Sequence, residues 1–182
     1  SRQRDVPVRL YMPLAATAEQ PVPLVVFSHG IGGSRRGYSY LGQHWASQGY
    51  ASLHLQHVGS DRSLWTGNPL ALAVRLQAAA QESEATARVR DLSFALDKLL
   101  SGPLAARVDS RRIVAAGHSY GANTTLLAVG AQVERDGQLL NLRDPRLKAA
   151  IVISAPPFYG ESTPERILGR SEERRVGKEC RL

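Results

Sequence analysis

The feature that most constrains the fold is a Gly-x-Ser-x-Gly sequence at 117–121, where an apolar run meets a segment with helical spacing. Residues 113–116 are all apolar and predict a buried strand, and apolar residues recur at helical spacing after the second glycine. A serine at the apex of such a turn is forced into a strained conformation, and Gly117 and Gly121 supply the clearance that lets strand and helix pass closely. The pattern therefore predicts a strand, a sharp turn and a helix, with the Ser119 hydroxyl exposed between them.

Ser119 is the nucleophile that this pattern indicates. Its hydroxyl is expected at the end of a sheet, over the positive end of the following helix, where a neighbouring imidazole could take its proton. Gly and Ser are common residues, so the five-residue pattern alone also fits a tight structural turn. The strand before it and the helix after it favour the nucleophile.

A glycine-rich loop, His-Gly-Ile-Gly-Gly at 29–33, follows a continuous apolar run that is typical of a central parallel strand. The loop lacks the sequences expected of a dinucleotide-binding or phosphate-binding loop. We interpret it as an oxyanion hole, in which Gly30 and Gly32 let backbone N–H groups turn inward. The predicted donors are the N–H groups of Ile31 and Tyr120, and a plain glycine turn is the alternative.

Apolar runs and helical stripes alternate along the rest of the chain. The predicted strands lie at 5–12, 23–28, 51–55, 113–116 and 147–154. The predicted helices lie at 38–49, over the second half of 68–102, and at 121–133, and a polar stretch with breakers covers 134–146. This alternation indicates an α/β fold, with a doubly wound, mostly parallel sheet and helices on both faces. Ligands bind at the carboxyl ends of strands in such sheets, where the glycine-rich loop and Ser119 are both expected.

Two histidines, His54 and His57, flank the end of the strand predicted at 51–55. They could be catalytic or bind a metal, but no third ligand sits at metal-binding spacing. A core histidine or a hydrogen-bonded loop histidine is the commoner fate, and we favour that interpretation. Asp61 and Trp65 in the following loop are predicted to shape the rim of a pocket, with a hydrophobic surface for acyl or alkyl groups.

Charge and composition argue against several other classes of protein. The formal net charge of +7 invites a nucleic-acid partner, but the arginines are scattered and form no basic stripe with interleaved aromatic residues. No apolar run reaches the ~20 residues that span a bilayer, so no transmembrane segment is predicted. The single cysteine, Cys180, excludes a disulfide framework or a cysteine metal site, and no cofactor is predicted.

The end of the sequence differs in character from the rest. Residues 170–181 resemble the translation of a common short-read sequencing adapter, and we interpret 170–182 as a non-native tail. Residues 1–169 are then the N-terminal part of a single domain, truncated after the strand near 147–154. The chain begins with Ser1, so a targeting segment could precede it and the compartment stays open.

Several segments together carry a family resemblance. They lie at 23–33, 38–41, 46–50 and 117–121. The chain is similar to the α/β-hydrolase superfamily and, within it, to bacterial dienelactone-hydrolase-like and platelet-activating-factor-acetylhydrolase-like serine esterases. This resemblance implies an α/β-hydrolase fold that cleaves carboxylic esters through an acyl-enzyme intermediate on Ser119, without a metal or organic cofactor.

The same resemblance implies a catalytic acid and then a histidine base after the nucleophile. All five histidines precede Ser119 in the sequence, and His118 is expected to point away from the serine hydroxyl. We therefore expect the acid and the base to lie beyond Gly169, and the chain as given to be inactive.

The predicted partner is a small-molecule ester, with a lipid-like ester left open, and no nucleic acid. Lipase, thioesterase and peptidase activities are alternatives within the same fold. A non-catalytic module that uses the fold for binding is the alternative from another class. The oligomeric state stays open.

Overall fold

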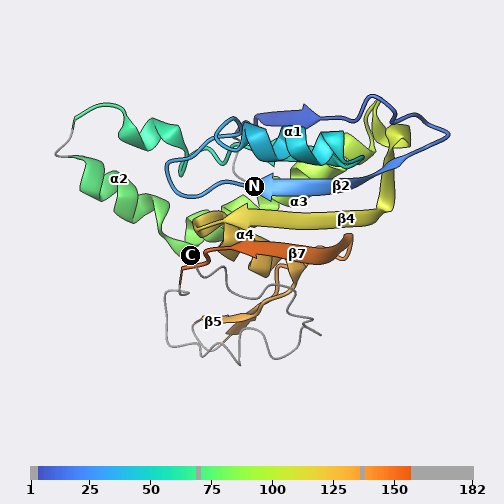
Figure 1. The fold of residues 1–182 in the computed structure, drawn as a ribbon. Coiled ribbons are helices and arrows are strands. Elements are labelled where there is room, and N and C mark those ends of the chain that lie inside the picture. Colours follow the sequence, from blue (N-terminus) through green and yellow to red (C-terminus); the bar gives the residue numbers. More distant parts are fainter. Residues whose placement is uncertain (1–3, 69–70, 136–137, 157–182) are drawn as a thin grey trace, which may run out of the picture.

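The computed structural model describes residues 4–68, 71–135 and 138–156, so the predicted tail lies outside the described residues. A five-stranded sheet with the order β1-β3-β2-β4-β7 forms its centre (Figure 1). The strands are β1 (Val8–Tyr11), β2 (Val22–Ser28), β3 (Ala51–Leu55), β4 (Val108–His118) and β7 (Leu147–Ile153). β1 pairs antiparallel with β3, and the other neighbours pair in parallel. The predicted mostly parallel sheet is confirmed, with β2, the apolar run before the glycine-rich loop, in the middle.

Helices cover both faces of this sheet. The helix α1 (Ser39–Ser47) packs on one face, whereas α3 (Glu82–Leu100) and α4 (Tyr120–Val129) pack on the other. The shorter elements are α2 (Leu72–Ala79), the 3-10 helices η1 (Arg62–Trp65) and η3 (Ala105–Arg107), and a hairpin of β5 (Val133–Arg135) and β6 (Gln138–Leu140). The predicted layers of an α/β fold are therefore present. None of the helices in the described ranges combines the length and apolar character needed to cross a membrane.

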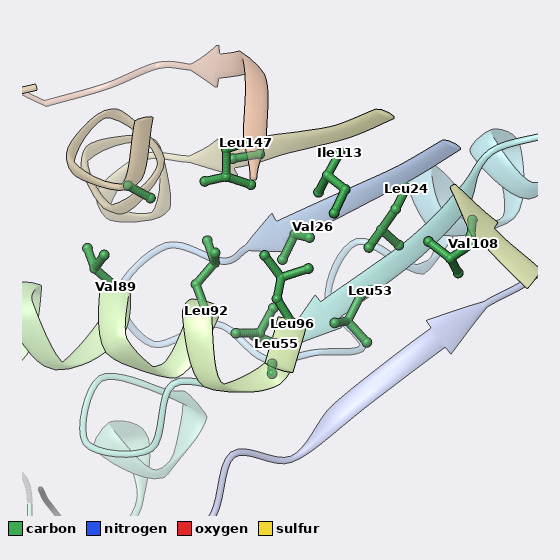
Figure 2. Packing of buried hydrophobic residues seen from close by; sticks show 14 of the residues in the cluster. Leu24, Val26, Leu53, Leu55, Val89, Leu92, Leu96, Val108, Ile113 and Leu147 are labelled. Atoms are coloured by element: carbon green, nitrogen blue, oxygen red, sulfur yellow. The ribbon is translucent and has the colours of Figure 1, made fainter. Parts of the chain in front are cut away.

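The face covered by α3 is aliphatic. Its main contributors, from α3 and three strands, are Leu24, Val26, Leu53, Leu55, Val89, Leu92, Leu96 and Ile113 (Figure 2). The α3 residues of this group recur at helical spacing, as expected for a stripe that faces the core. Burial of this stripe fixes α3 against the sheet.

The face covered by α1 is aromatic. The ring of Phe27 on β2 has its centroid 4.8 Å from that of Tyr38, 6.1 Å from that of Trp45 and 4.9 Å from that of His54. Tyr38 and Trp45 come from the helical stripe predicted between 38 and 49. Aromatic contacts thus attach α1 to the sheet.

The sequence analysis placed the end of α4 too late in the chain and missed a hairpin beyond it. The helix predicted to reach 133 ends at Val129, because Gly130 adopts a left-handed backbone with φ 116° that closes the last turn. The stretch that follows was predicted as polar and interrupted by breakers, and it contains the short β5–β6 hairpin instead.

The prediction of a buried strand at 147–154 was correct for the strand and wrong for its burial. Leu147 is buried, but the side chains of residues 148–152 are exposed. β7 forms the edge of the described sheet, pairing with β4 and contacting α4. No described element lies beyond it, so its apolar side chains stay accessible.

Candidate functional site at the nucleophile turn

Ser119 lies at the sharp turn between β4, which ends at His118, and α4, which begins at Tyr120. Its backbone has φ 53° and ψ −124°, a conformation that residues with side chains rarely adopt. The Ser119 N–H donates to the Ile153 carbonyl of β7 at 2.9 Å, and the Ala122 N–H donates to the Ser119 carbonyl at 2.8 Å. These hydrogen bonds hold the strained turn and leave the serine half-buried at the carboxyl end of β4.

The two glycines of the motif are required by close backbone contacts. A Cβ atom on Gly117 would lie 2.1 Å from the carbonyl oxygen of Gly121, and one on Gly121 would lie 2.0 Å from the carbonyl oxygen of Ser28. No side chain fits at either position without moving strand, helix or loop. Such clearance is the role that the strand-turn-helix pattern gives to glycine.

The glycine loop (residues 29–33) lies beside this turn. A Cβ atom on Gly30 would be 3.2 Å from the Cβ of Ser119, so the loop and the nucleophile turn are in contact. Gly32 has φ 73° and its N–H donates to the Ser60 carbonyl at 2.9 Å. The intervening Ile31 N–H has no hydrogen-bond partner among the described residues. A backbone donor is therefore available next to the serine.

Aromatic side chains border the glycine loop. Trp65 is 59% exposed, and its Nε1 donates to the Gly32 carbonyl at 3.0 Å. Tyr38 Oη and His118 Nδ1 are hydrogen-bonded at 2.7 Å, and burial raises the pKa of Tyr38. Trp65 thus contacts the glycine loop, and His118 is hydrogen-bonded to Tyr38.

Asp61, predicted at the same rim, is buried. Its carboxylate accepts hydrogen bonds from the Ser63 N–H at 3.1 Å and from the Gln56 side-chain amide at 2.6 Å. It caps η1, which carries Trp65. Asp61 therefore stabilises the 3-10 helix that carries Trp65, and its own side chain is buried.

Comparison with known proteins identifies the fold. A family model described as platelet-activating factor acetylhydrolase, isoform II, matches residues 3–85, and no curated protein matches the sequence. The chain is similar to the crystal structure of a dienelactone hydrolase from Anabaena variabilis, with 18% identity over 70% of this chain and 52% of that chain and a TM-score of 0.51. It is also similar to a propionate-bound thermophilic esterase from Thermogutta terrifontis, with 18% identity over 85% of this chain and 51% of that chain and a TM-score of 0.51. The chain has the α/β-hydrolase fold.

A ferulic acid esterase from Streptomyces cinnamoneus shares 34% identity over 58% of this chain and 32% of that chain, with a TM-score of 0.48. The chain spans about half of the dienelactone hydrolase and of the T. terrifontis esterase, and about a third of the ferulic acid esterase. The sharp strand-to-helix turn at the carboxyl end of β4 carries Ser119.

Two of the buried histidines of this hydrolase fold, His29 and His54, are neutral. The Nε2 of His29 accepts from the His57 N–H at 3.1 Å, which leaves its Nδ1 to donate to the Gly30 carbonyl at 2.6 Å. Burial, and then the charge of Arg88, lower the pKa of His29 to about 4. Burial likewise lowers the pKa of His54, which packs among aromatic rings, to about 4. The interpretation of His54 as a core histidine is confirmed.

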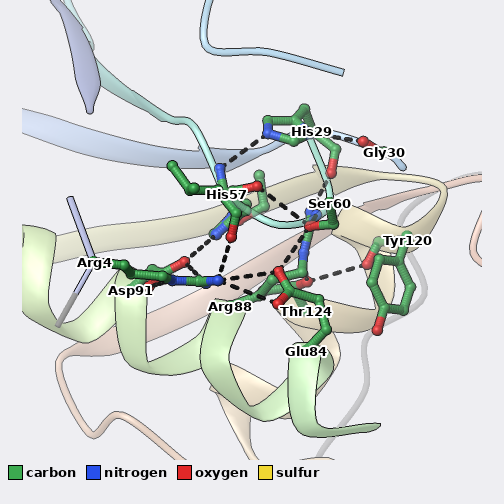
Figure 3. A network of polar contacts seen from close by, with 12 residues as sticks. Arg4, His29, Gly30, His57, Ser60, Glu84, Arg88, Asp91, Tyr120 and Thr124 are labelled. Atoms are coloured by element: carbon green, nitrogen blue, oxygen red, sulfur yellow. Dashed lines mark hydrogen bonds and ion pairs between the residues drawn. The ribbon is translucent and has the colours of Figure 1, made fainter. Parts of the chain in front are cut away.

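His57 is buried in the loop after β3 and uses both ring nitrogens. Its Nδ1 faces Asp91 Oδ2 at 3.0 Å (Figure 3). Its Nε2 lies 3.0 Å from Ser28 Oγ. A carboxylate only accepts, so Nδ1–H donates to Asp91 and Nε2 accepts from the Ser28 hydroxyl. Burial lowers the pKa of His57 well below its ordinary value, so the ring is neutral. His57 is a hydrogen-bonded loop histidine, as favoured from the sequence.

Sequence analysis missed Arg88, a fully buried cation on α3. It precedes Leu92 and Leu96 by four and eight residues, so it occupies the helix face that packs on the sheet. An arginine on that stripe was the available signal, because buried charge needs partners. Within the described residues no cluster of three or more His, Cys, Asp or Glu side chains could hold a metal ion.

Proposed function

We propose that this chain carries the nucleophile and the oxyanion hole of a serine hydrolase that cleaves carboxylic esters. The observation that carries the proposal is the strained backbone of Ser119, φ 53°, on a strand-to-helix turn that touches the glycine loop. The family-model match and the esterases among similar structures support a hydrolase. That the bond cleaved is a carboxylic ester is our inference from Ser119 and the neighbouring backbone donors.

In the proposed reaction, Ser119 Oγ attacks the ester carbonyl and gives its proton to a general base. The carbonyl oxygen becomes an oxyanion, which the N–H groups of Ile31 and Tyr120 stabilise. Collapse of the tetrahedral intermediate breaks the bond to the alcohol, which leaves with the proton from the base. Water then attacks the acyl-enzyme by the same steps and releases the carboxylic acid and free Ser119.

The base in this scheme comes from outside the described residues. His29 and His57 are buried and hydrogen-bonded elsewhere, and His54 is buried among aromatic rings. His44 is exposed on α1, and His118 is hydrogen-bonded to Tyr38. We infer a histidine and its acid partner after Gly169, in the order that the fold uses. The substrate is inferred to be a small-molecule ester bound beside Trp65, with lipid-like esters as one arm of the test.

The proposal is tested on the intact protein, expressed from the uninterrupted reading frame that contains this chain. We expect hydrolysis of p-nitrophenyl esters and stoichiometric labelling of Ser119 by a fluorophosphonate, read by mass spectrometry of the labelled peptide. Ser119→Ala should lower kcat by roughly 10⁶-fold, the order found when a serine nucleophile is removed. Comparing acetyl, octanoyl and phospholipid sn-2 esters separates small-molecule from lipid-like substrates.

Ser101→Ala is the matched control. Ser101 is an exposed serine at the end of α3, bonded through Oγ to the Asp97 carbonyl, and its removal should leave kcat unchanged. Full activity in Ser119→Ala would overturn the nucleophile assignment. Absence of both turnover and labelling in the intact protein would instead favour a non-catalytic binding module.

A further inference from the structure

Arg88 connects the two parts of the proposed active site from behind. Its side chain is fully buried between α3, α4 and the loops that follow β2 and β3 (Figure 3). Burial lowers the pKa of Arg88 to about 10, so the guanidinium keeps its charge at neutral pH. A buried cation is costly unless its donors are matched, which makes the identity of its partners informative.

Each end of the guanidinium bonds a different segment of the chain. Its Nε donates to Thr124 Oγ1 of α4 at 2.9 Å, and one terminal nitrogen donates to Ser60 Oγ at 2.8 Å. The other terminal nitrogen donates to the carbonyl of His29, the first residue of the glycine loop. One planar group therefore joins the glycine loop, the loop after β3 and the helix behind Ser119.

The contacts of Arg88 include Tyr120 itself and the first residue of the loop that carries Ile31. Its Cζ lies 4.9 Å from the ring centroid of Tyr120, over the ring, and Thr124 Oγ1 also donates to the Tyr120 carbonyl at 3.1 Å. The His29 carbonyl that Arg88 binds lies two residues before Ile31. The two segments that carry the proposed donors thus contact a common side chain.

Ser60 completes the attachment of the glycine loop. Its hydroxyl accepts from Arg88 and donates to Glu84 Oε1 at 2.9 Å, while its carbonyl accepts from the Gly32 N–H at 2.9 Å. Glu84 supplies negative charge near the guanidinium, and Arg4 is paired with it at 3.2 Å. The loop is consequently held at His29 and at Gly32, on either side of Ile31.

We propose that Arg88 is a positioning residue that sets the distance between the Ile31 and Tyr120 N–H groups in the oxyanion hole. This inference rests on the proposed esterase function. Arginine suits the role because its donors have fixed directions in one plane, whereas a lysine ammonium at the same place cannot reach three acceptors in different elements. A purely structural role would instead affect folding without selectively weakening the binding of the oxyanion.

The test compares Arg88→Lys with wild type in the intact protein. A trifluoromethyl ketone, whose serine adduct carries an oxyanion, reports on the oxyanion hole, and KM for p-nitrophenyl acetate is measured beside it as the apparent affinity for the uncharged substrate. We expect kcat to fall about 10–100-fold and the inhibition constant of the ketone to rise by a similar factor, with KM within about threefold of wild type. Thr124→Val removes the acceptor of Arg88 Nε together with the hydrogen bond from Thr124 Oγ1 to the Tyr120 carbonyl. It should shift kcat and the inhibition constant in the same direction by less, and it provides the test if Arg88→Lys fails to fold.

Arg146→Lys is the matched control. Arg146 bonds Asp144 and Asp97, and Asp97 is nine residues along α3 from Arg88, about 14 Å away along the helix. This control should change stability only. If the ketone and KM shift by equal factors in Arg88→Lys and Thr124→Val, or neither shifts, Arg88 has no positioning role. A wild-type protein that neither hydrolyses the ester nor binds the ketone overturns the esterase proposal itself, and the role of Arg88 with it.

Discussion

His54 and His57 are three residues apart in the sequence and both are buried, but they lie on opposite sides of the sheet. His54 faces α1, with its ring 4.9 Å from Phe27 and 5.0 Å from Tyr11. Neither of its ring nitrogens has a hydrogen-bond partner among the described residues. His57 faces α3 and has a partner on each ring nitrogen.

The difference shows that the two sides of the sheet surround a buried histidine differently, with ring packing around His54 and hydrogen bonds around His57. On the side of α1, buried polar atoms of Tyr11, Ser52 and His54 share an aromatic environment and have no partner in the described part of the chain. On the side of α3, the buried Asp91 is hydrogen-bonded to His57, and the buried Arg88 donates to the His29 carbonyl of the glycine loop. The charged contact to the glycine loop thus comes from the α3 side, whereas Tyr38 contacts His118 from the α1 side.

The largest expected effect comes from exchanging each histidine for phenylalanine. His57→Phe leaves Ser28 Oγ unsatisfied and removes one hydrogen bond to Asp91 Oδ2, which keeps Arg4 as a partner. An unsatisfied buried group costs about 1–3 kcal/mol and a hydrogen bond to a charged group contributes about 1.5–3 kcal/mol, so we expect a loss of about 3 kcal/mol in the free energy of unfolding. His54→Phe keeps a ring among rings and removes two unpartnered nitrogens, so it should stay within about 1 kcal/mol of wild type or exceed it. Urea denaturation of the intact protein measures both.

The two variants control for each other, because the substitution and the burial are the same. Equal destabilisation by both would mean that the hydrogen bonds of His57 contribute nothing beyond the shape of the ring. A strong loss in His54→Phe alone would reverse the comparison.

Lowering the pH should also reduce the stability of the folded protein, because the buried histidines resist protonation, but the expected loss is smaller. The pKa of His54 is lowered from its ordinary value of 6.5 to about 4, mainly by burial. Between these values the unfolded chain binds the proton and the folded chain does not, so stability falls as the pH falls. This group alone should cost about 2 kcal/mol between pH 6.5 and pH 5.

Denaturation curves at both pH values test this contribution. His54→Phe should be less sensitive to pH than wild type by that amount, while His29 and His57 titrate in both proteins. An unchanged pH dependence in His54→Phe would mean that the folded protein protonates His54 near its ordinary pKa.

The local parts of the site were predictable because their residues are contiguous. The spacing of Gly117, Ser119 and Gly121 contains the whole turn, and the glycine loop follows its strand directly. The side taken by His54 also follows from the two-residue period of β3, since Leu53 and Leu55 face α3.

Arg88 shows where such reasoning ends. Its partners at 29, 60 and 124 come from separate elements that meet only after the parallel crossovers are made. The helical stripe of α3 indicates that Arg88 is buried, but it carries no information about which carbonyl or hydroxyl lies opposite. The exposed side chains of β7 were missed for a related reason, because an apolar run predicts a strand and not its neighbours.

The smallest expected effect comes from removing one buried serine hydroxyl on each side of the sheet. Ser28 and Ser52 are both fully buried on neighbouring strands. Ser28 Oγ donates to His57 Nε2 at 3.0 Å, so Ser28→Ala should cost about 1 kcal/mol of unfolding free energy. Ser52 Oγ has no partner among the described residues, so Ser52→Ala should be neutral or slightly stabilising.

This pair of variants sharpens the comparison because alanine removes one oxygen atom and almost no packing. Combining Ser28→Ala with His57→Phe should cost less than the two single variants together, since both remove the same hydrogen bond. Strict additivity would mean that the serine and the histidine stabilise the protein independently. In that case the polar network would not act as a unit, and the support it gives the glycine loop would have to come from Arg88 and Ser60 alone.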